Sequence, residues 1–118
     1  MHVVRGDSSE EKPTNSPVMI GDVKMRVLVS NKMSPDVAVG LVRFLDGART
    51  KRHTHTASQV LYILEGEGIL ADDEIEHHVT AGDIVHVDAG TVHWHGAEPG
   101  KMMAHLSIIP PSTTEVFE

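Results

Sequence analysis

The sequence predicts an all-β fold, a sandwich or barrel of short strands. Apolar and β-branched residues gather in short runs that are separated by turn residues such as Asp-Gly, Asp-Asp and Pro-Gly. These turn signals recur every few to about twelve residues, a spacing typical of all-β domains. No segment combines a helical apolar period with capping residues. Short strands and tight turns favour a jelly roll, in which two sheets enclose a cavity.

A polar arm precedes the predicted sheet. Residues 1–17 contain Pro13 and Pro17 and few apolar anchors, so we expect a loose or partly ordered segment. At most it would add an edge strand through Val3 and Val4.

Three strands are expected in the first half of the domain, because β-branched and apolar residues dominate there. They are predicted at 24–30, 37–45 and 58–66. Asp46-Gly47 ends the second run, and Gly66 and Gly68 end or bend the third.

The second half continues with a hairpin and further strands. Residues 68–79 favour a hairpin that folds at Asp72-Asp73. The later strands are predicted at 83–87, 92–97 and 102–109. Pro110-Pro111 should end the sheet, because proline cannot donate a ladder hydrogen bond. The expected organisation is an arm at 1–17, one domain at 18–111 and a tail at 112–118.

Composition limits both the core and the partners. The chain has 118 residues, enough for one domain, and is 40% hydrophobic but only 3% aromatic, so an aliphatic core is expected. The net charge of −7 and the lack of a concentrated basic face disfavour nucleic-acid binding. The absence of cysteine excludes disulfides and thiolate metal sites. Without an apolar leader or a run of about 18 apolar residues, a cytoplasmic protein with no membrane partner is expected.

Four of the nine histidines form two H-x-H pairs, His53 with His55 and His93 with His95. Residues i and i+2 of a strand project to the same face, so each pair presents two imidazoles side by side. Gln59 returns to the face of His55 if the strand stays regular. Such donors, brought together by neighbouring strands, would bind a metal ion. The alternative is two pairs of solvated imidazoles on an exposed face.

Two segments resemble the sequence motifs of the cupin superfamily. "GARTKRHTHTASQVLYILEG" resembles the first motif, G-x5-H-x-H-x3-4-E-x6-G, with Gln59 where cupins usually have glutamate. "GDIVHVDAGTVH" resembles the second, G-x5-P-x-G-x2-H-x3-N, with Asp88 in place of the proline and Ala97 in place of the asparagine. The resemblance covers about residues 37–110 and implies the cupin double-stranded β-helix, a jelly-roll barrel.

A narrower resemblance involves "GARTKRHTH", Gln59 and "HWHGA". These stretches are similar to small cupins associated with carboxymuconolactone decarboxylase-like proteins, a group that includes cupin-type manganese hydroxynitrile lyases. Pectin-degradation cupins share the three-His, one-Gln set but not "HWHGA". The resemblance implies one divalent transition metal held by His53, His55, Gln59 and His93. Manganese is the first expectation, with iron, nickel, cobalt or zinc as alternatives, because these ligands do not select one metal.

The glutamine bears on the expected chemistry. Gln59 would offer a neutral carbonyl oxygen, so that with three neutral imidazoles the metal would keep its full charge and be a stronger Lewis acid. This favours lyase, isomerase or hydration chemistry over a redox role, although some cupin dioxygenases also lack the glutamate.

The resemblance and strand parity also suggest a substrate pocket. It would be lined by Val42, Phe44, Thr50, His105 and Ile109. His95 is two residues from His93 and should project to the same face, so it is the candidate for transferring a proton. The alternative is that His95 is a buried structural histidine. For His105 the alternative is exposure to solvent.

Three other histidines and Trp94 are expected to lie away from the metal. His77 and His78 are adjacent on one strand and should both be surface residues, whereas His86 should be a satisfied structural histidine. Trp94 should point outward.

The predicted protein is a homodimer, from the habit of cupins and the edge strands such folds expose. It would act on a small-molecule substrate, with carbon–carbon or carbon–oxygen lyase chemistry first and oxygen-dependent cleavage second. A non-catalytic binding or sensing module, or a structural or vacant site, is the alternative.

Overall fold

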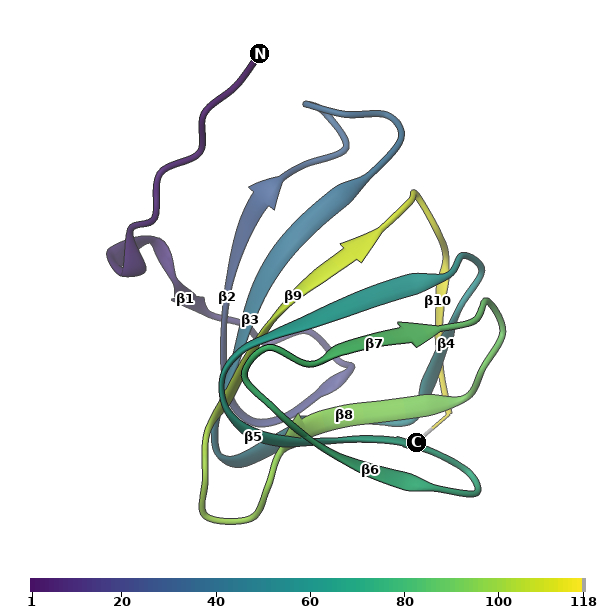
Figure 1. Ribbon diagram of the computed structural model, residues 1–118. Coiled ribbons are helices and arrows are strands. Elements are labelled where there is room, and N and C mark those ends of the chain that lie inside the picture. Colours follow the sequence, from purple (N-terminus) through teal and green to yellow (C-terminus); the bar gives the residue numbers. More distant parts are fainter. Residues whose placement is uncertain (118) are drawn as a thin grey trace.

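The computed structural model describes residues 1–117 and confirms the all-β class (Figure 1). Within these residues the only helix is the 3₁₀ turn η1, Ser8–Glu10. The first strands are β1 Lys12–Pro13, β2 Met19–Val29, β3 Ala38–Thr50, β4 His53–His55 and β5 Gln59–Asp72. The later strands are β6 Glu76–Thr80, β7 Ile84–Val87, β8 His93–Ala97, β9 Met103–Ile109 and β10 Thr114–Val116. No helix in this part of the chain is long and apolar enough to cross a membrane.

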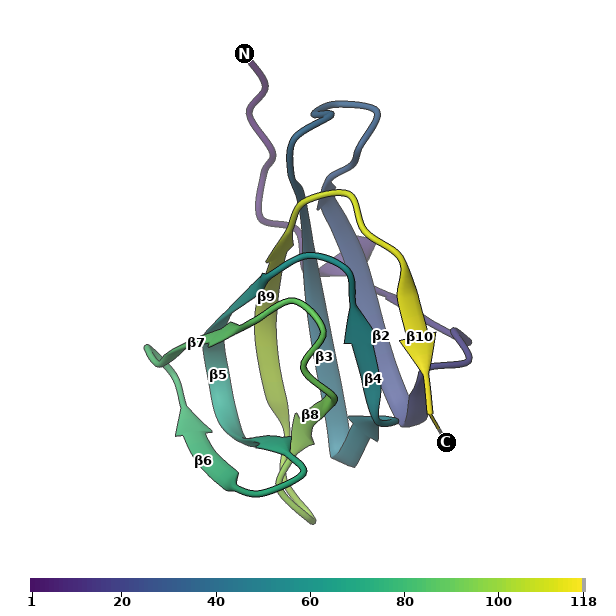
Figure 2. The same cartoon turned by 90° about the vertical axis from the view of Figure 1, so that its right-hand side faces the viewer.

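The strands form one continuous antiparallel ladder that curls into the predicted jelly-roll barrel (Figures 1 and 2). The ladder runs β1-β2-β3-β9-β5-β8-β4-β10. The first part of β5 pairs with β9 and β7, and its last part pairs with β8 and β6. Likewise β3 pairs with β2 and β9 and meets β8 where Arg49 lies opposite Gly96. These two long strands therefore join the two sheets and close the barrel.

Glycines permit the bend in β5, which is one of the two outcomes expected at Gly66 and Gly68. Gly66 has a φ of +79°, a conformation that residues with a Cβ rarely adopt. A Cβ on Gly66 would also overlap the carbonyl oxygen of Met102. A shift of register between Ile63 and Glu65 marks the same bend. Gly66 therefore bends β5 rather than ending it.

The core lies between the two sheets and is mostly aliphatic, as expected. Phe44, Leu61, Ile63 and Met103 are among its fully buried members. Along β3 the buried positions alternate through Gly40, Val42 and Phe44, the period of a strand with one inward face. This alternation is why the pattern of the sequence could identify the strands.

The N-terminal arm differs from expectation. Val3 and Val4 are exposed and lie outside any strand, and the edge strand is formed by Lys12–Pro13 instead. The bidentate contact of Arg43 with Glu11, at 2.8 and 3.3 Å, anchors this end of the arm to β3. The strand therefore forms where the arm is tied to the sheet, and not where its apolar residues are.

The C-terminal end also differs. Pro110-Pro111 was expected to end the sheet, but β10 follows and pairs with β4 in the register Thr114↔His55, Glu115↔Thr54 and Val116↔His53. The two prolines end β9 only, and the chain then crosses to the other sheet (Figure 2).

Candidate metal centre

Three imidazoles converge inside the barrel. His53 and His55 leave β4 on the same face, and His93 leaves β8 opposite His53 in the β4–β8 ladder. One ring nitrogen from each of them lies within 4.8 Å of the other two. His53 and His93 are buried and His55 is half-buried. The two H-x-H motifs thus meet across neighbouring strands, at a separation suited to a shared metal ion.

The outer nitrogens of these rings all have partners. The Nδ1 atoms of His53 and His93 lie 2.7 Å and 2.9 Å from the carbonyl oxygens of Lys51 and Thr91. A carbonyl can only accept, so both rings carry their proton on Nδ1 and leave the Nε2 lone pair free. The Nε2 atoms of His93 and His55 are buried and have no hydrogen-bond partner. These buried atoms without partners are the ones that a metal would satisfy.

Gln59 is the fourth candidate metal ligand, through its side-chain carbonyl oxygen. Its Nε2 donates to the hydroxyl of Ser107 at 2.8 Å. Its Oε1 is buried without a partner, an arrangement that costs free energy unless something binds there. Ser107 thus orients the amide with its oxygen free. The residues present fit a divalent metal with three nitrogen ligands and one neutral oxygen ligand.

Burial keeps these imidazoles neutral. Burial, together with a smaller effect of neighbouring histidines, lowers the pKa of His53 and of His55 from the ordinary 6.5 to about 4; for His53 the bond to the Lys51 carbonyl opposes this lowering. Burial likewise lowers the pKa of His93, against the opposing effect of its bond to the Thr91 carbonyl. At neutral pH all three rings are therefore in the form that binds metal.

Beside the candidate metal ligands lies a second pair of histidines. Nε2 of His105 is 2.9 Å from Nδ1 of His95, and both rings are buried. The His95 ring stacks on His93, with centroids 5.6 Å apart, and the Nε2 of His95 has no partner. Phe44 packs edge-on against His95 at 5.8 Å. Burial lowers the pKa of both His95 and His105, so the pair is neutral and shares one hydrogen bond.

A cavity of about 360 Å³ opens onto these groups between β2 and β10. Its polar lining includes Thr50, His53, His55, Gln59, His95, His105, Ser107 and Thr114. Its apolar lining includes Pro17, Val18, Met19, Met25, Val42 and Val116. The structure therefore brings Val42, Thr50, His95 and His105 together with three of the expected ligands.

Two predicted pocket residues lie elsewhere. Phe44 is fully buried and supports the His95–His105 pair from behind instead of facing the cavity. Ile109 lines an adjoining groove with Val27 and Val29, because it pairs with Ala38 at the far end of β9. Both residues stand at the inward-facing positions of their strands, as predicted. They lie outside the cavity because of where they are along the strand.

The sequence did not indicate two walls of this cavity. Ser16 and Pro17 were assigned to the loose arm, and Thr114 and Val116 to the tail. For Met19 and Met25 an alternating pattern along β2 was available as a signal, since Val23 and Met25 share the inward face. For Thr114 there was none, because a three-residue edge strand has too few residues to show a period.

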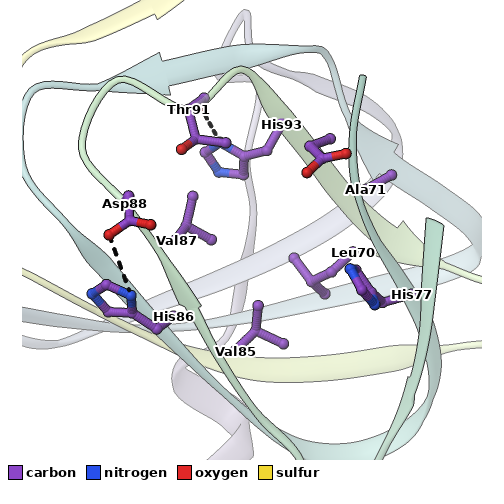
Figure 3. A pocket seen from close by; sticks show the side chains of 10 residues that line it. Leu70, Ala71, His77, Val85, His86, Val87, Asp88, Thr91 and His93 are labelled. Carbon is purple, nitrogen blue, oxygen red and sulfur yellow. Dashed lines mark hydrogen bonds and ion pairs between the residues drawn. The ribbon is translucent and has the colours of Figure 1, made fainter. Parts of the chain in front are cut away.

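A second pocket, of about 190 Å³, is lined by His93 and by residues of β5, β6 and β7 (Figure 3). His86 stands at its rim with Nδ1 3.7 Å from the Asp88 carboxylate, and its side chain is 56% exposed. The prediction of a structural His86 is therefore wrong, because Val85 and Val87 take the inward positions of β7. His77 and His78 are exposed, as expected.

Trp94 points to the outside, opposite in parity to His93 and His95. The guanidinium carbon of Arg49 lies 4.1 Å from the centre of the indole, a cation–π contact on the barrel surface. Trp94 is thus excluded from the metal centre.

Comparison with known proteins agrees with this geometry. The family model described as "Cupin domain" matches residues 40–109. A cupin-like protein of Thermotoga maritima has a TM-score of 0.86 and 28% sequence identity, covering 95% of this chain and 89% of that one.

Curated relatives include both lyases and a dioxygenase. An (R)-mandelonitrile lyase of Granulicella tundricola is 40% identical over 73 residues, covering 61% of this chain and 56% of the relative. Dimethylsulfoniopropionate lyase DddW of Ruegeria pomeroyi is 30% identical over 81 residues, covering 67% and 53%. An acireductone dioxygenase of Sulfurihydrogenibium is 40% identical over 57 residues, covering 42% and 32%. The chain spans about half the length of the two lyases.

Proposed function

The chain belongs to the cupin domain family, and from this premise we propose that it is a metalloenzyme that cleaves a small organic molecule as a lyase. One divalent transition metal, manganese first, would be held by His53, His55, Gln59 and His93. The observation that carries the proposal is the set of buried acceptor atoms without partners, which includes Oε1 of Gln59 and Nε2 of His93. Such a set is costly in a folded protein unless an ion satisfies it.

The ligands of the proposed site carry no charge. Three neutral imidazoles and an amide oxygen leave a divalent ion its full charge, so the ion would supply strong Lewis acidity to a bound substrate. This favours polar bond cleavage over a role that cycles the metal between oxidation states. Two lyases among the relatives support the same choice.

His95 is proposed to accept or return a proton during cleavage. When its Nδ1–H donates to Nε2 of His105, the lone pair on its own Nε2 is free beside the cavity. Because the pKa of His95 lies well below 6.5, the ring is neutral at pH 7 and has that lone pair available. The pair can also adopt the reversed tautomers, in which Nε2 of His95 carries the proton. His105 therefore positions His95 in either state.

The cavity limits the size and polarity of the substrate. At about 360 Å³ it is near the lower end of ligand pockets, which hold about 300–1,000 Å³. Met19, Met25 and Val42 add apolar surface to its lining beside the polar groups. A small molecule with one apolar side and one oxygen-bearing end fits this lining.

Metal content is the first test. Protein purified without a histidine tag should contain close to one equivalent of divalent metal or bind it on titration. At a metal concentration about 100 times Kd, binding adds about 2.7 kcal/mol and should raise the Tm by about 10 °C in a domain of this size. Less than a tenth of an equivalent, with no gain in Tm on adding manganese, nickel or zinc, would refute metal binding.

Turnover is the second test. Metal-loaded protein should release aldehyde from mandelonitrile, and the His95→Ala variant should lose at least about 100-fold in rate while retaining its metal. His86→Ala, which changes a histidine outside the cavity, is the matched control. Full turnover in metal-loaded His95→Ala would refute the proton-transfer role.

Oxygen-dependent cleavage is the second candidate, because an acireductone dioxygenase is among the relatives. Oxygen uptake with diketones or catechols, combined with no cleavage of nitriles, would replace the lyase proposal with this one. If metal-loaded protein binds such ligands without turning them over, the protein is a binding or sensing cupin.

We further propose that two copies associate through the outer face of β5, β7 and β9. Tyr62 and Ile84 lie opposite each other on β5 and β7, and they are 37% and 66% exposed. Leu106 lies beside Tyr62 on β9. Adjacent exposed apolar residues favour an interface. Light scattering should give twice the chain mass, and Ile84→Glu should give the monomer.

A further inference from the structure

We infer that Thr114, on the C-terminal strand β10, is a positioning residue of the metal centre. Its hydroxyl oxygen lies 2.9 Å from Nδ1 of His55, on the side of the ring away from the proposed metal. The inference rests on the proposed metal binding. It assigns part of that site to a strand that follows both H-x-H motifs and lies beyond residues 40–109, which match the cupin family model.

His55 differs from the other two histidines in how its outer nitrogen is held. His53 and His93 face backbone carbonyls only two residues earlier in the chain, Lys51 and Thr91. These bonds are local and depend on no particular side chain. His55 faces a side chain 59 residues away, so its orientation depends on the docking of β10.

The backbone places the Thr114 hydroxyl at this position. In the β4–β10 ladder Thr114 lies directly opposite His55, so both side chains project to the same face. The neighbouring bond from the Thr56 N–H to the Thr113 carbonyl, at 3.1 Å, fixes that register. Within the described chain β10 pairs with β4 alone, so β4 is what holds it against the barrel.

The hydroxyl makes His55 the ligand that responds to metal. A carbonyl can only accept, so His53 and His93 keep the metal-binding tautomer at all times. A hydroxyl can accept or donate, so without metal His55 can carry its proton on either nitrogen. If Nε2 of His55 held a metal, the ring would carry its proton on Nδ1, and this N–H would donate to the Thr114 hydroxyl. Metal binding should therefore hold β10 in place, and by reciprocity a docked β10 should strengthen metal binding.

The experiment compares Thr114→Val, which removes the hydroxyl at nearly constant shape, with Thr114→Ser, which keeps it. Loss of an outer hydrogen bond to a metal-bound histidine typically weakens binding by about 10- to 100-fold. We expect about tenfold for Thr114→Val, since His55 is only half-buried and water can replace part of the bond. Thr114→Ser should stay close to the wild type. Glu115→Ala, on the same strand but with its side chain on the other face, is the matched control.

Amide hydrogen exchange provides a second readout that does not depend on turnover. In the wild type, metal should slow exchange over residues 113–117, and in Thr114→Val this slowing should be smaller. Valine is a good strand former, so the variant should fold. If Thr114→Val does not fold, hydrogen exchange in the wild type tests the inference instead. If metal does not slow exchange over residues 113–117 in the wild type, the inference is overturned.

Two failures can be told apart. If Thr114→Val binds manganese as tightly as the wild type, Thr114 is not a positioning residue, and the proposed function stands. If the wild type itself binds no manganese, nickel or zinc, it is the proposed metal centre that fails.

Discussion

Acid should destabilise the metal-free protein in a pH range set by its buried histidines. His95 and His105 are buried together and neutral, whereas in the unfolded chain each would titrate near the ordinary pKa of 6.5. Between the folded and unfolded pKa values the unfolded state binds more protons. The free energy of unfolding therefore rises with pH in this window and falls as the solution is acidified.

The magnitude follows from His105. Burial lowers its pKa from 6.5 to about 4, and its side chain is fully buried, so no correction for solvent screening applies. At about 1.4 kcal/mol per pKa unit, this one group contributes about 3 kcal/mol to the free energy of unfolding at neutral pH. Most of this contribution is lost as the pH falls from 6.5 to 4.5. This is a large fraction of the roughly 5–15 kcal/mol that stabilises a typical domain. His95 contributes in the same direction.

Urea unfolding of the metal-free protein at pH 7.0, 6.0, 5.0 and 4.5 measures this effect. His105→Gln removes one titrating group and keeps a donor for Nδ1 of His95, so its stability should fall less steeply with acid. His86→Gln changes an exposed histidine and serves as the control. Carboxylates with a lowered pKa, such as Glu11, act at a lower pH, below their ordinary 4.5. If the free energy of unfolding stays constant or increases as the pH is lowered from 6.5 to 4.5, the buried pair is not neutral.

Two further predictions concern single side chains. Ser107→Ala should weaken metal binding by about three- to tenfold in a manganese titration, because one hydrogen bond worth about 0.5–1.5 kcal/mol no longer orients Gln59; unchanged affinity would contradict this role. Gly66→Ala should cost at least about 3 kcal/mol in urea unfolding, because the new Cβ would overlap the Met102 carbonyl. Gly82→Ala has a similar φ of +95° but nothing within 4 Å of the Cβ, and should cost only about 1 kcal/mol; equal losses would refute the steric argument.

The candidate metal ligands were predictable because their signal is local. His53 and His55 project to one side because they are two apart in a strand, and the same holds for His93 and His95. The resemblance to cupin motifs then implied that the two pairs meet, and the ladder pair His53↔His93 confirms it. Strand positions were predictable for the same reason, since one buried face imposes an alternating pattern.

Alternation along a strand predicts which face of the sheet a side chain is on, but not where along the barrel it lies. Phe44 and Ile109 both point inward as expected, yet one is packed behind the histidine pair and the other lies beyond the cavity. His86 was misassigned because either face of an apolar strand can be the inner one, and Val85 and Val87 took it. How the strands pair and stagger decides these positions.

The sequence by itself determined the all-β class, most of the strands and the candidate metal ligands. Only the tertiary structure decided that β10 returns past Pro110-Pro111 to hold His55, and that His105 reaches His95. The physical reason is that alternation along a strand is set by the backbone of that strand alone. A contact such as that of Thr114 with His55 joins residues 59 apart, and it exists only once the intervening strands have paired.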